Sequence, residues 1–263
     1  MLFYISLETY RRELSLVREP LSLDSIANHI ATRHHLRGMV VPTDFLKGFE
    51  VADLDTFRAH NDKGGCPALA LHELTGLRLA SRDDAVAGAA LDRLERVLIA
   101  AQRLGCGSVG FSIESADTDE YFDLAVDRLR QCATRAERLE LNLLLNPHRG
   151  ITENPERVVD IIKKVGGFRL GVLPDFADAA ESADPFSYIK MLAPYAPIVL
   201  ASTVKFDKKG RHTPYDIAPM CEALRVIGYN AGISLLYKGE GETDEGVDIS
   251  RETLTGELVQ EEA

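Results

Sequence analysis

The chain alternates short apolar runs rich in strand-forming residues with longer stretches that have the period of an α-helix. Eight such units follow one another, and this repetition is typical of parallel strands joined by helices. The expected strands cover residues 2–7, 38–42, 68–72, 108–113, 141–145, 168–175, 197–202 and 232–237. A length of 263 residues suits a single (β/α)8 TIM barrel, which commonly has about 250 residues. We therefore predict an α/β chain with this fold.

The predicted helices have clear apolar faces and ends. Leu94 and Leu98 lie on one stripe of a long helix, and Gly105 is placed to stop it. The acidic segment from about 244 to 263 is expected to form a last helix with a solvated tail. No linker interrupts the chain, so we expect one domain over residues 1–263.

Charge and cysteine content limit the partners and the compartment. The chain has 30 Lys and Arg against 41 Asp and Glu, a formal charge of −11, which disfavours nucleic acid. No apolar run approaches the roughly 20 residues that span a membrane, and none at the start has the length of a signal peptide. The four cysteines show no CxxC spacing, so we expect a reducing, cytoplasmic setting.

Polar residues at the carboxyl ends of the expected strands define the candidate pocket, because barrel active sites lie at that face. They are Glu8, Asp44, His72, Glu73, Glu114, Asn146, His148, Asp175, Ser202, Lys205, Tyr237 and Lys238. Any one of them can instead close the barrel mouth by hydrogen bonds or lie in a solvated loop. Together they predict a site for a small polar metabolite.

The second half of the chain carries a specific resemblance. LLLNPHRGITENPERVVDIIKKVG, LGVLPDFAD and the segment ending in GISLLYKG resemble the sugar phosphate isomerase/epimerase family with the xylose-isomerase-like barrel. The resemblance covers roughly residues 141–239, whereas the first half agrees mainly in its rhythm of units. It implies a barrel that acts on sugar-like substrates, with a divalent cation held by carboxylates and often a histidine at the strand ends.

Several family positions differ here. The glutamate that ends the fifth strand falls on Asn146, whose neutral amide is a weaker ligand and cannot act as a base. The aspartate that ends the sixth strand is retained as Asp175. Residues 200–202 read Leu-Ala-Ser where relatives often place a histidine and a lysine around an alanine. The family's IEYEG is LLYKG, which puts Leu236 and Lys238 at two acidic positions.

These departures predict a degenerate metal site, with weak divalent binding at most and no resident cofactor. We expect a protein that binds a sugar-like metabolite without ordinary metal-dependent catalysis. Catalytic roles would fall to Asp175 as a general base and to His148. Expected substrate-binding residues are Asn146, Glu8, Asp44, His72, Glu114, Ser202, Lys205 and Lys238. A homodimer is plausible by analogy with such barrels.

Two alternatives remain open at this point. An active metal-dependent isomerase or epimerase could recruit ligands from Asp44, His72, Glu73 or Glu114. An apurinic-site endonuclease shares the barrel, but it needs a three-metal cluster rich in histidine and acids, and the charge of −11 disfavours it. Elsewhere, His34 follows a predicted helix and shows no partner at ligand spacing.

Overall fold

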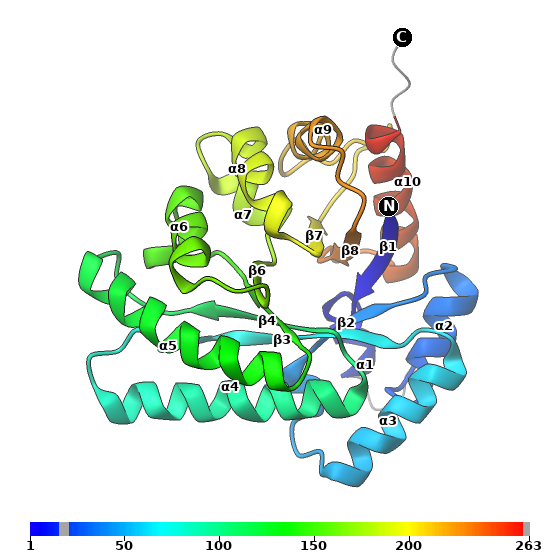
Figure 1. Cartoon of the computed structure of the whole chain (residues 1–263). Helices are drawn as coiled ribbons and strands as arrows, with labels where there is room; N and C mark the ends of the chain where they lie inside the picture. The colour runs from blue at the N-terminus through cyan, green and yellow to red at the C-terminus, as the bar shows by residue number, and fades with distance from the viewer. Residues whose placement is uncertain (16–20, 260–263) are drawn as a thin grey trace. The chain divides into compact units, whose positions relative to one another are not determined.

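The computed structural model describes residues 1–15 and 21–259. Strands and helices alternate along the chain, with helices following the strands (Figure 1). The strands are β1 (Leu2–Ser6), β2 (Met39–Pro42), β3 (Ala68–Leu77), β4 (Ser108–Ile113), β5 (Asn142–Leu145), β6 (Leu170–Val172), β7 (Ile198–Thr203) and β8 (Gly232–Tyr237). The predicted strands are thus confirmed in number and order.

Ten α-helices and four short 3-10 helices are seen in the described part of the chain. The α-helices are α1 (Arg11–Leu14), α2 (Ile26–Arg33), α3 (Val51–Gly64), α4 (Asp84–Leu104), α5 (Asp119–Arg138), α6 (Pro155–Val165), α7 (Phe176–Glu181), α8 (Pro185–Leu192), α9 (Ala218–Val226) and α10 (Thr243–Leu258). The 3-10 helices are η1 (Leu7–Tyr10), η2 (Thr43–Leu46), η3 (Gly150–Thr152) and η4 (Ala193–Tyr195). No helix of the described residues is both long enough and apolar enough to span a membrane.

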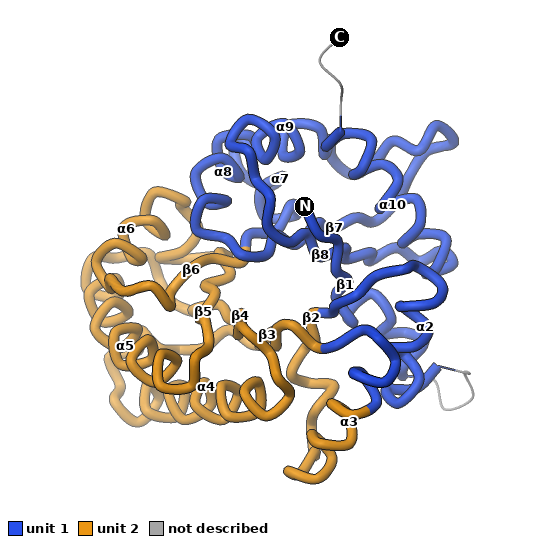
Figure 2. Tube along the Cα trace, turned by 45° about the vertical axis from the view of Figure 1, so that its right-hand side comes forward, with its two compact units in different colours: residues 1–39, 60–67, 174–263 blue, residues 40–59, 68–173 orange. Residues whose placement is uncertain are grey.

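The contacts divide the chain into two compact units (Figure 2). Unit 1 comprises residues 1–39, 60–67 and 174–263. Within it β8 pairs in parallel with β1 and with β7. Unit 2 comprises residues 40–59 and 68–173, and its strands β3, β4, β5 and β6 pair in parallel in that order. The single domain predicted from the sequence stays a prediction.

Each unit buries an apolar core along its strands, and local caps fix the helices. Leu71, Phe111 and Leu144 are fully buried in unit 2. The carboxylate of Asp83 accepts from the backbone of the first turn of α4, and Gly105 ends that helix with φ 77°. A left-handed residue is what a helix stop requires, and glycine adopts it without a Cβ clash. The predicted stop at Gly105 is confirmed.

Some boundaries differ from the prediction. β3 continues to Leu77 with an irregular register after Glu73, so His72 lies inside the strand and not at its end. β6 is limited to Leu170–Val172, because Gly166 and Gly167 both have positive φ and the following Phe168 is fully exposed. The last helix is confirmed as α10, and the end of its predicted tail, residues 260–263, lies outside the described residues. All four cysteines are free and buried.

Candidate functional site

Asp175 lies beside the strand β7 in unit 1, where it forms a parallel bridge with Leu200. It follows β6 and caps α7, with Oδ1 accepting from the Ala177 amide at 3.0 Å. Its Oδ2 accepts from the Ser202 hydroxyl at 2.7 Å. The backbone supports this contact, because the Leu200 amide donates to the Pro174 carbonyl. Asp175 and Ser202 are 6% and 1% exposed, so this is a buried, charge-assisted contact at the strand ends.

A second carboxyl lies one helical turn further along α7. Asp178 is half-buried in the first turn of that helix. Burial, and then the negative charge of Asp175, raise the pKa of Asp178 to about 7, while Lys238 opposes the rise. A carboxyl group with such a pKa exchanges its proton at neutral pH, as general acids and bases require. The sequence prediction missed Asp178, although its spacing of three residues from Asp175 on a helix was a usable signal.

Two tyrosines face the same pair of carboxyls. Burial and the charges of Asp178 and Asp175 raise the pKa of Tyr188 on α8 well above its usual value. The pKa of Tyr215 is raised in the same way, and its hydroxyl donates to the carbonyl oxygen of Ser202. Both phenols therefore keep their protons near neutral pH, which makes them hydrogen-bond donors.

A buried histidine holds Tyr215 in place. His212 Nδ1 lies 2.8 Å from the Tyr215 carbonyl oxygen, and its Nε2 accepts from the Val204 amide at 2.9 Å. Burial lowers the pKa of His212, so the ring is neutral with its proton on Nδ1. This loop arrangement was not predicted, because its partners depend on tertiary contacts and not on spacing.

The other predicted residues of unit 1 lie nearer the surface. Lys205 and Lys238 are exposed and line one groove of about 540 Å³ together with Tyr237. Glu8 is half-buried and pairs with Arg11, with Oε1 2.7 Å from Nε. Unit 1 thus brings Asp175 and Ser202 into contact, and the charge of Lys238 acts on Asp178.

In unit 2, the buried carboxylate of Glu73 is already neutralised. It is 3% exposed, and its Oε2 accepts from Arg93 Nε at 2.7 Å and from the Thr43 hydroxyl at 3.1 Å. Neighbouring His72 is also buried, packed so near Gly110 that a Cβ there would lie 3.2 Å from its ring.

The remaining predicted residues of unit 2 vary in exposure. Asp44 and Glu114 are exposed. Asn146 is half-buried, and its side-chain amide donates to the Leu173 carbonyl at 2.8 Å. His148 is exposed, and its backbone amide donates to Thr152 Oγ1 at 3.2 Å. The Asn146 amide nitrogen is therefore committed to the backbone of the β6 end.

Comparison with known proteins places this chain in a family. The model of the xylose isomerase-like TIM barrel matches residues 30–255. The chain belongs to this family. The predicted α/β fold, a (β/α)8 TIM barrel, is thereby confirmed, and so is the resemblance that the strand-end motifs indicated. No curated protein sequence matches the chain.

Solved structures of similar fold include sugar epimerases. An L-ribulose 3-epimerase is 17% identical with a TM-score of 0.79, over 98% of this chain and 95% of that one. A D-tagatose 3-epimerase-like protein is 20% identical with a TM-score of 0.76, over 98% and 97%. The IOLI protein, solved with a bound zinc atom, is 16% identical with a TM-score of 0.75, over 98% of both chains. At these identities the likeness shows the fold of this xylose isomerase-like barrel.

Proposed function

We propose that this barrel binds a small polyhydroxylated, sugar-like metabolite at Asp175 and Asp178 and that the two carboxyls move a proton on it without a divalent cation. The observation that carries the proposal is the pair itself. Asp178 has a pKa of about 7 because of burial and the nearby charge of Asp175, and such tuned carboxyls are typical of acid–base sites. The names of the similar structures, which include sugar epimerases, support the substrate class.

The contacts at the strand ends support a metal-independent site. Both oxygens of Asp175 already accept hydrogen bonds. Leu236 is apolar and 4% exposed, and Lys238 brings a positive charge to the acidic pair. A hard divalent cation needs several oxygen ligands and net negative charge, so this donor set does not fit one, and the proposed chemistry has no step through a metal.

The alternative, an active metal-dependent enzyme with ligands from Asp44, His72, Glu73 or Glu114, has less support. Glu73 is bound by Arg93 and Thr43, and breaking a buried ion pair leaves an uncompensated charge. Asp44 and Glu114 are exposed. A metal ion at Glu73 would therefore have to replace its pairing with Arg93.

The proposed chemistry is proton transfer next to a carbonyl. Asp175 takes the proton from the carbon beside the substrate carbonyl, and protonated Asp178 gives its proton to the oxygen of the resulting enediolate. The positive charge of Lys238 stabilises the developing negative charge. Delivery of a proton to the opposite face of the same carbon gives epimerisation, and delivery to the former carbonyl carbon gives isomerisation. In both cases an enediol hydroxyl returns its proton to Asp178 as the carbonyl forms again. The role of Asn146 and His148, which belong to unit 2, in binding substrate hydroxyls stays a prediction from the sequence.

The test is deuterium exchange by protein treated with EDTA. The protein is incubated in D2O with D-fructose, D-psicose, D-tagatose or L-ribulose, and incorporation next to the carbonyl is followed by NMR. We expect exchange by the wild type and a loss of roughly 100-fold or more in Asp175→Asn and Asp178→Asn, the usual size of a general acid–base contribution. Asp160→Asn, an exposed aspartate of α6, is the matched control.

The same samples give two further readouts. The exchange rate of the wild type should change with a midpoint near pH 7, and Asp178→Asn should remove this midpoint. Calorimetric binding of the same sugars should weaken in Asp175→Asn. A wild type that neither binds any of these sugars nor exchanges deuterium contradicts the proposal, and so does exchange that appears on addition of Mn²⁺ alone.

A further inference from the structure

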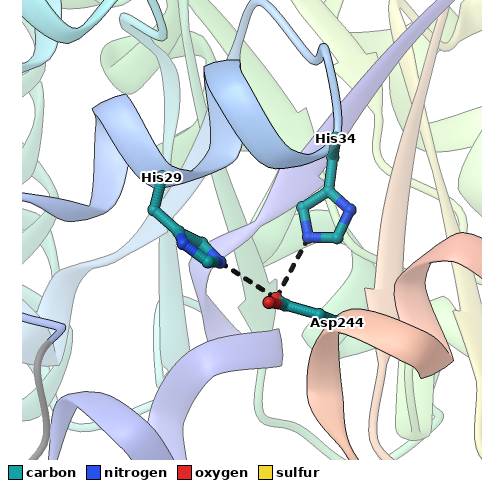
Figure 3. A group of neighbouring side chains, drawn as sticks. All are labelled: His29, His34 and Asp244. Carbon is teal, nitrogen blue, oxygen red and sulfur yellow. Dashed lines mark hydrogen bonds and ion pairs between the residues drawn. The ribbon is translucent and has the colours of Figure 1, made fainter.

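A second group of ligand-type side chains lies on helices α2 and α10 of unit 1. His29 is on α2, His34 is the residue that ends it, and Asp244 lies in the first turn of α10 (Figure 3). Asp244 Oδ1 is 3.0 Å from His29 Nε2 and 3.1 Å from His34 Nε2. The three ligand atoms lie within 4.8 Å of one another. None of these residues belongs to the strand ends discussed above.

The end of α2 brings the two imidazoles together. Residues five apart do not share a face of a regular helix, but α2 stops at Arg33, and His35 takes a φ of 55°. His34 is the C-cap residue with φ −109° and ψ −5°, and its ring meets the ring of His29 edge to face at 5.9 Å. The His34 side chain is fully buried, whereas His29 and Asp244 are 25% and 32% exposed. One side of the group is thus open to water.

An outer set of contacts orients the ligands. His34 Nδ1 lies 2.8 Å from Asp248 Oδ1, so this nitrogen carries a proton and Nε2 is turned toward Asp244. A carboxylate on the far nitrogen of a histidine is the arrangement that fixes metal-binding imidazoles. The Tyr10 hydroxyl lies 2.8 Å from both Asp244 Oδ1 and His34 Nε2.

The contacts of this group converge on one carboxylate oxygen. Asp244 Oδ1 accepts from the Tyr10 hydroxyl at 2.8 Å and lies 3.0 Å from His29 Nε2 and 3.1 Å from His34 Nε2. Because His34 Nδ1 faces Asp248, the His34 Nε2 atom is turned toward these oxygens. A divalent ion placed between the two imidazoles and the carboxylate would accept these lone pairs.

We propose that His29 Nε2, His34 Nε2 and Asp244 Oδ1 bind one zinc-class divalent ion, with water as a fourth ligand on the open side. Two imidazole nitrogens and one carboxylate suit Zn²⁺ or Co²⁺, whereas Mg²⁺ and Ca²⁺ prefer oxygen. Ligand atoms of a tetrahedral zinc site lie about 3.3 Å apart, near the two distances observed.

The charges around the site are compatible with a divalent ion. Arg33 lies 2.6 Å from Asp248 Oδ2 and 3.9 Å from Asp244 Oδ2. Its guanidinium therefore balances one of the two carboxylates and leaves one negative charge for the ion. The bound ion links the N-terminal segment to the last helix, because its ligands come from α2 and α10.

Calorimetric titration of EDTA-treated protein with Zn²⁺ tests this site. The wild type should bind one equivalent with micromolar or tighter affinity, and Co²⁺ should give the intense visible bands of tetrahedral coordination. His29→Ala and Asp244→Asn should weaken binding by more than about 100-fold, and Asp248→Asn, which touches only the outer nitrogen, by about 10- to 100-fold.

Two controls locate the ion. His35→Asn removes an exposed neighbouring imidazole at a left-handed position that asparagine tolerates, and it should bind zinc as the wild type does. Asp175→Asn should also bind normally, so loss of the proposed sugar chemistry and loss of this site are separate results.

Three results would overturn the proposal. They are a folded wild type that takes up no zinc, equal affinity in wild type and His29→Ala, and loss of zinc in Asp175→Asn. If no zinc is taken up and nitrogen NMR shows His34 protonated on both ring nitrogens, the group is a hydrogen-bonded network and not a metal site.

Discussion

Asp178 and Asp244 are both aspartates at the start of a helix, but their pKa values are shifted in opposite directions. Both lie in unit 1, both are partly exposed, and both are in the first turn of a helix, α7 and α10 respectively. The pKa of Asp178 is raised to about 7. Burial also acts to raise the pKa of Asp244, but hydrogen bonds from His29, Tyr10 and His34 bring it below its usual value.

The difference shows what decides the state of a carboxyl group in this molecule. A helix start favours negative charge at both positions, so it cannot explain opposite directions. Burial acts to raise the pKa of both carboxyls. At Asp178 the charge of Asp175 adds to this effect, whereas at Asp244 hydrogen bonds from two imidazoles and a phenol outweigh it. A nearby negative charge favours the protonated carboxyl group, whereas hydrogen-bond donors favour the carboxylate.

The largest effect should come from Asp178→Asn, which we expect to stabilise the protein at pH 8. The step from an ordinary aspartate pKa of about 4 to about 7 corresponds to about 4 kcal/mol, and partial exposure reduces our expectation to about 3 kcal/mol. The folded chain holds this proton more tightly than the unfolded chain, so wild-type stability falls as the pH rises from about 4 to 7. The gain should vanish near pH 4. Urea unfolding at several pH values measures it.

The control for this prediction is Asp160→Asn, which removes an exposed aspartate from α6. It should change stability by less than about 0.5 kcal/mol at every pH. If Asp178→Asn gives no more stabilisation than Asp160→Asn at pH 8, then burial and the charge of Asp175 do not raise the pKa of Asp178, and the contrast with Asp244 fails.

The second largest effect should be the stabilisation of the folded chain by zinc, which depends on Asp244 and not on Asp178. An ion that binds the folded chain at one hundred times its dissociation constant stabilises it by about 2.7 kcal/mol. This gain should appear in the wild type and in Asp178→Asn, and Asp244→Asn should lose it. Thermal unfolding with and without Zn²⁺ is the measurement. An equal zinc-dependent rise in Asp244→Asn would place the ion elsewhere.

Without metal, Asp244→Asn should destabilise the protein by about 2 kcal/mol at pH 7, because hydrogen bonds to a charged acceptor are lost. The sign is the reverse of that at Asp178. A lowered pKa gives stability that is present above about pH 4 and is lost as the pH falls through the folded value. The difference from the wild type should therefore shrink in acid. A loss that is constant from pH 3 to 8 would contradict the charge-based explanation.

Much of the fold was accessible from the sequence, because strand and helix periods and stops such as Gly105 are local signals. The length of β3 was not, since its continuation past Glu73 depends on pairing with β4 and on an irregular register. The short β6 likewise depends on the turn at Gly166 and Gly167. These features depend on tertiary contacts between residues far apart in the sequence, so a short stretch of sequence does not predict them.

The candidate sites divide in the same way. Asp175 and Ser202 were predicted as strand-end residues, and the structure joins them. Asp178 was missed because its acidity depends on Asp175 and burial. His34 has no partner at ligand spacing in the sequence, and its partner Asp244 lies 210 residues away in the chain. A ligand set of this kind is set by the packing of helices and not by spacing.

The smallest effect on stability should come from Ser202. Its hydroxyl donates to Asp175, the carboxylate whose charge helps to raise the pKa of Asp178. Ser202→Ala removes a buried 2.7 Å hydrogen bond to Asp175 and should cost about 1 kcal/mol of unfolding free energy. Ser234 is a matched control on the adjoining strand β8, because its hydroxyl is fully buried and finds no hydrogen-bond partner among the described residues. Ser234→Ala should therefore be neutral or slightly stabilising. Equal losses in the two variants would mean that packing of the serine side chain, and not its bond to Asp175, holds this corner of the acidic pair.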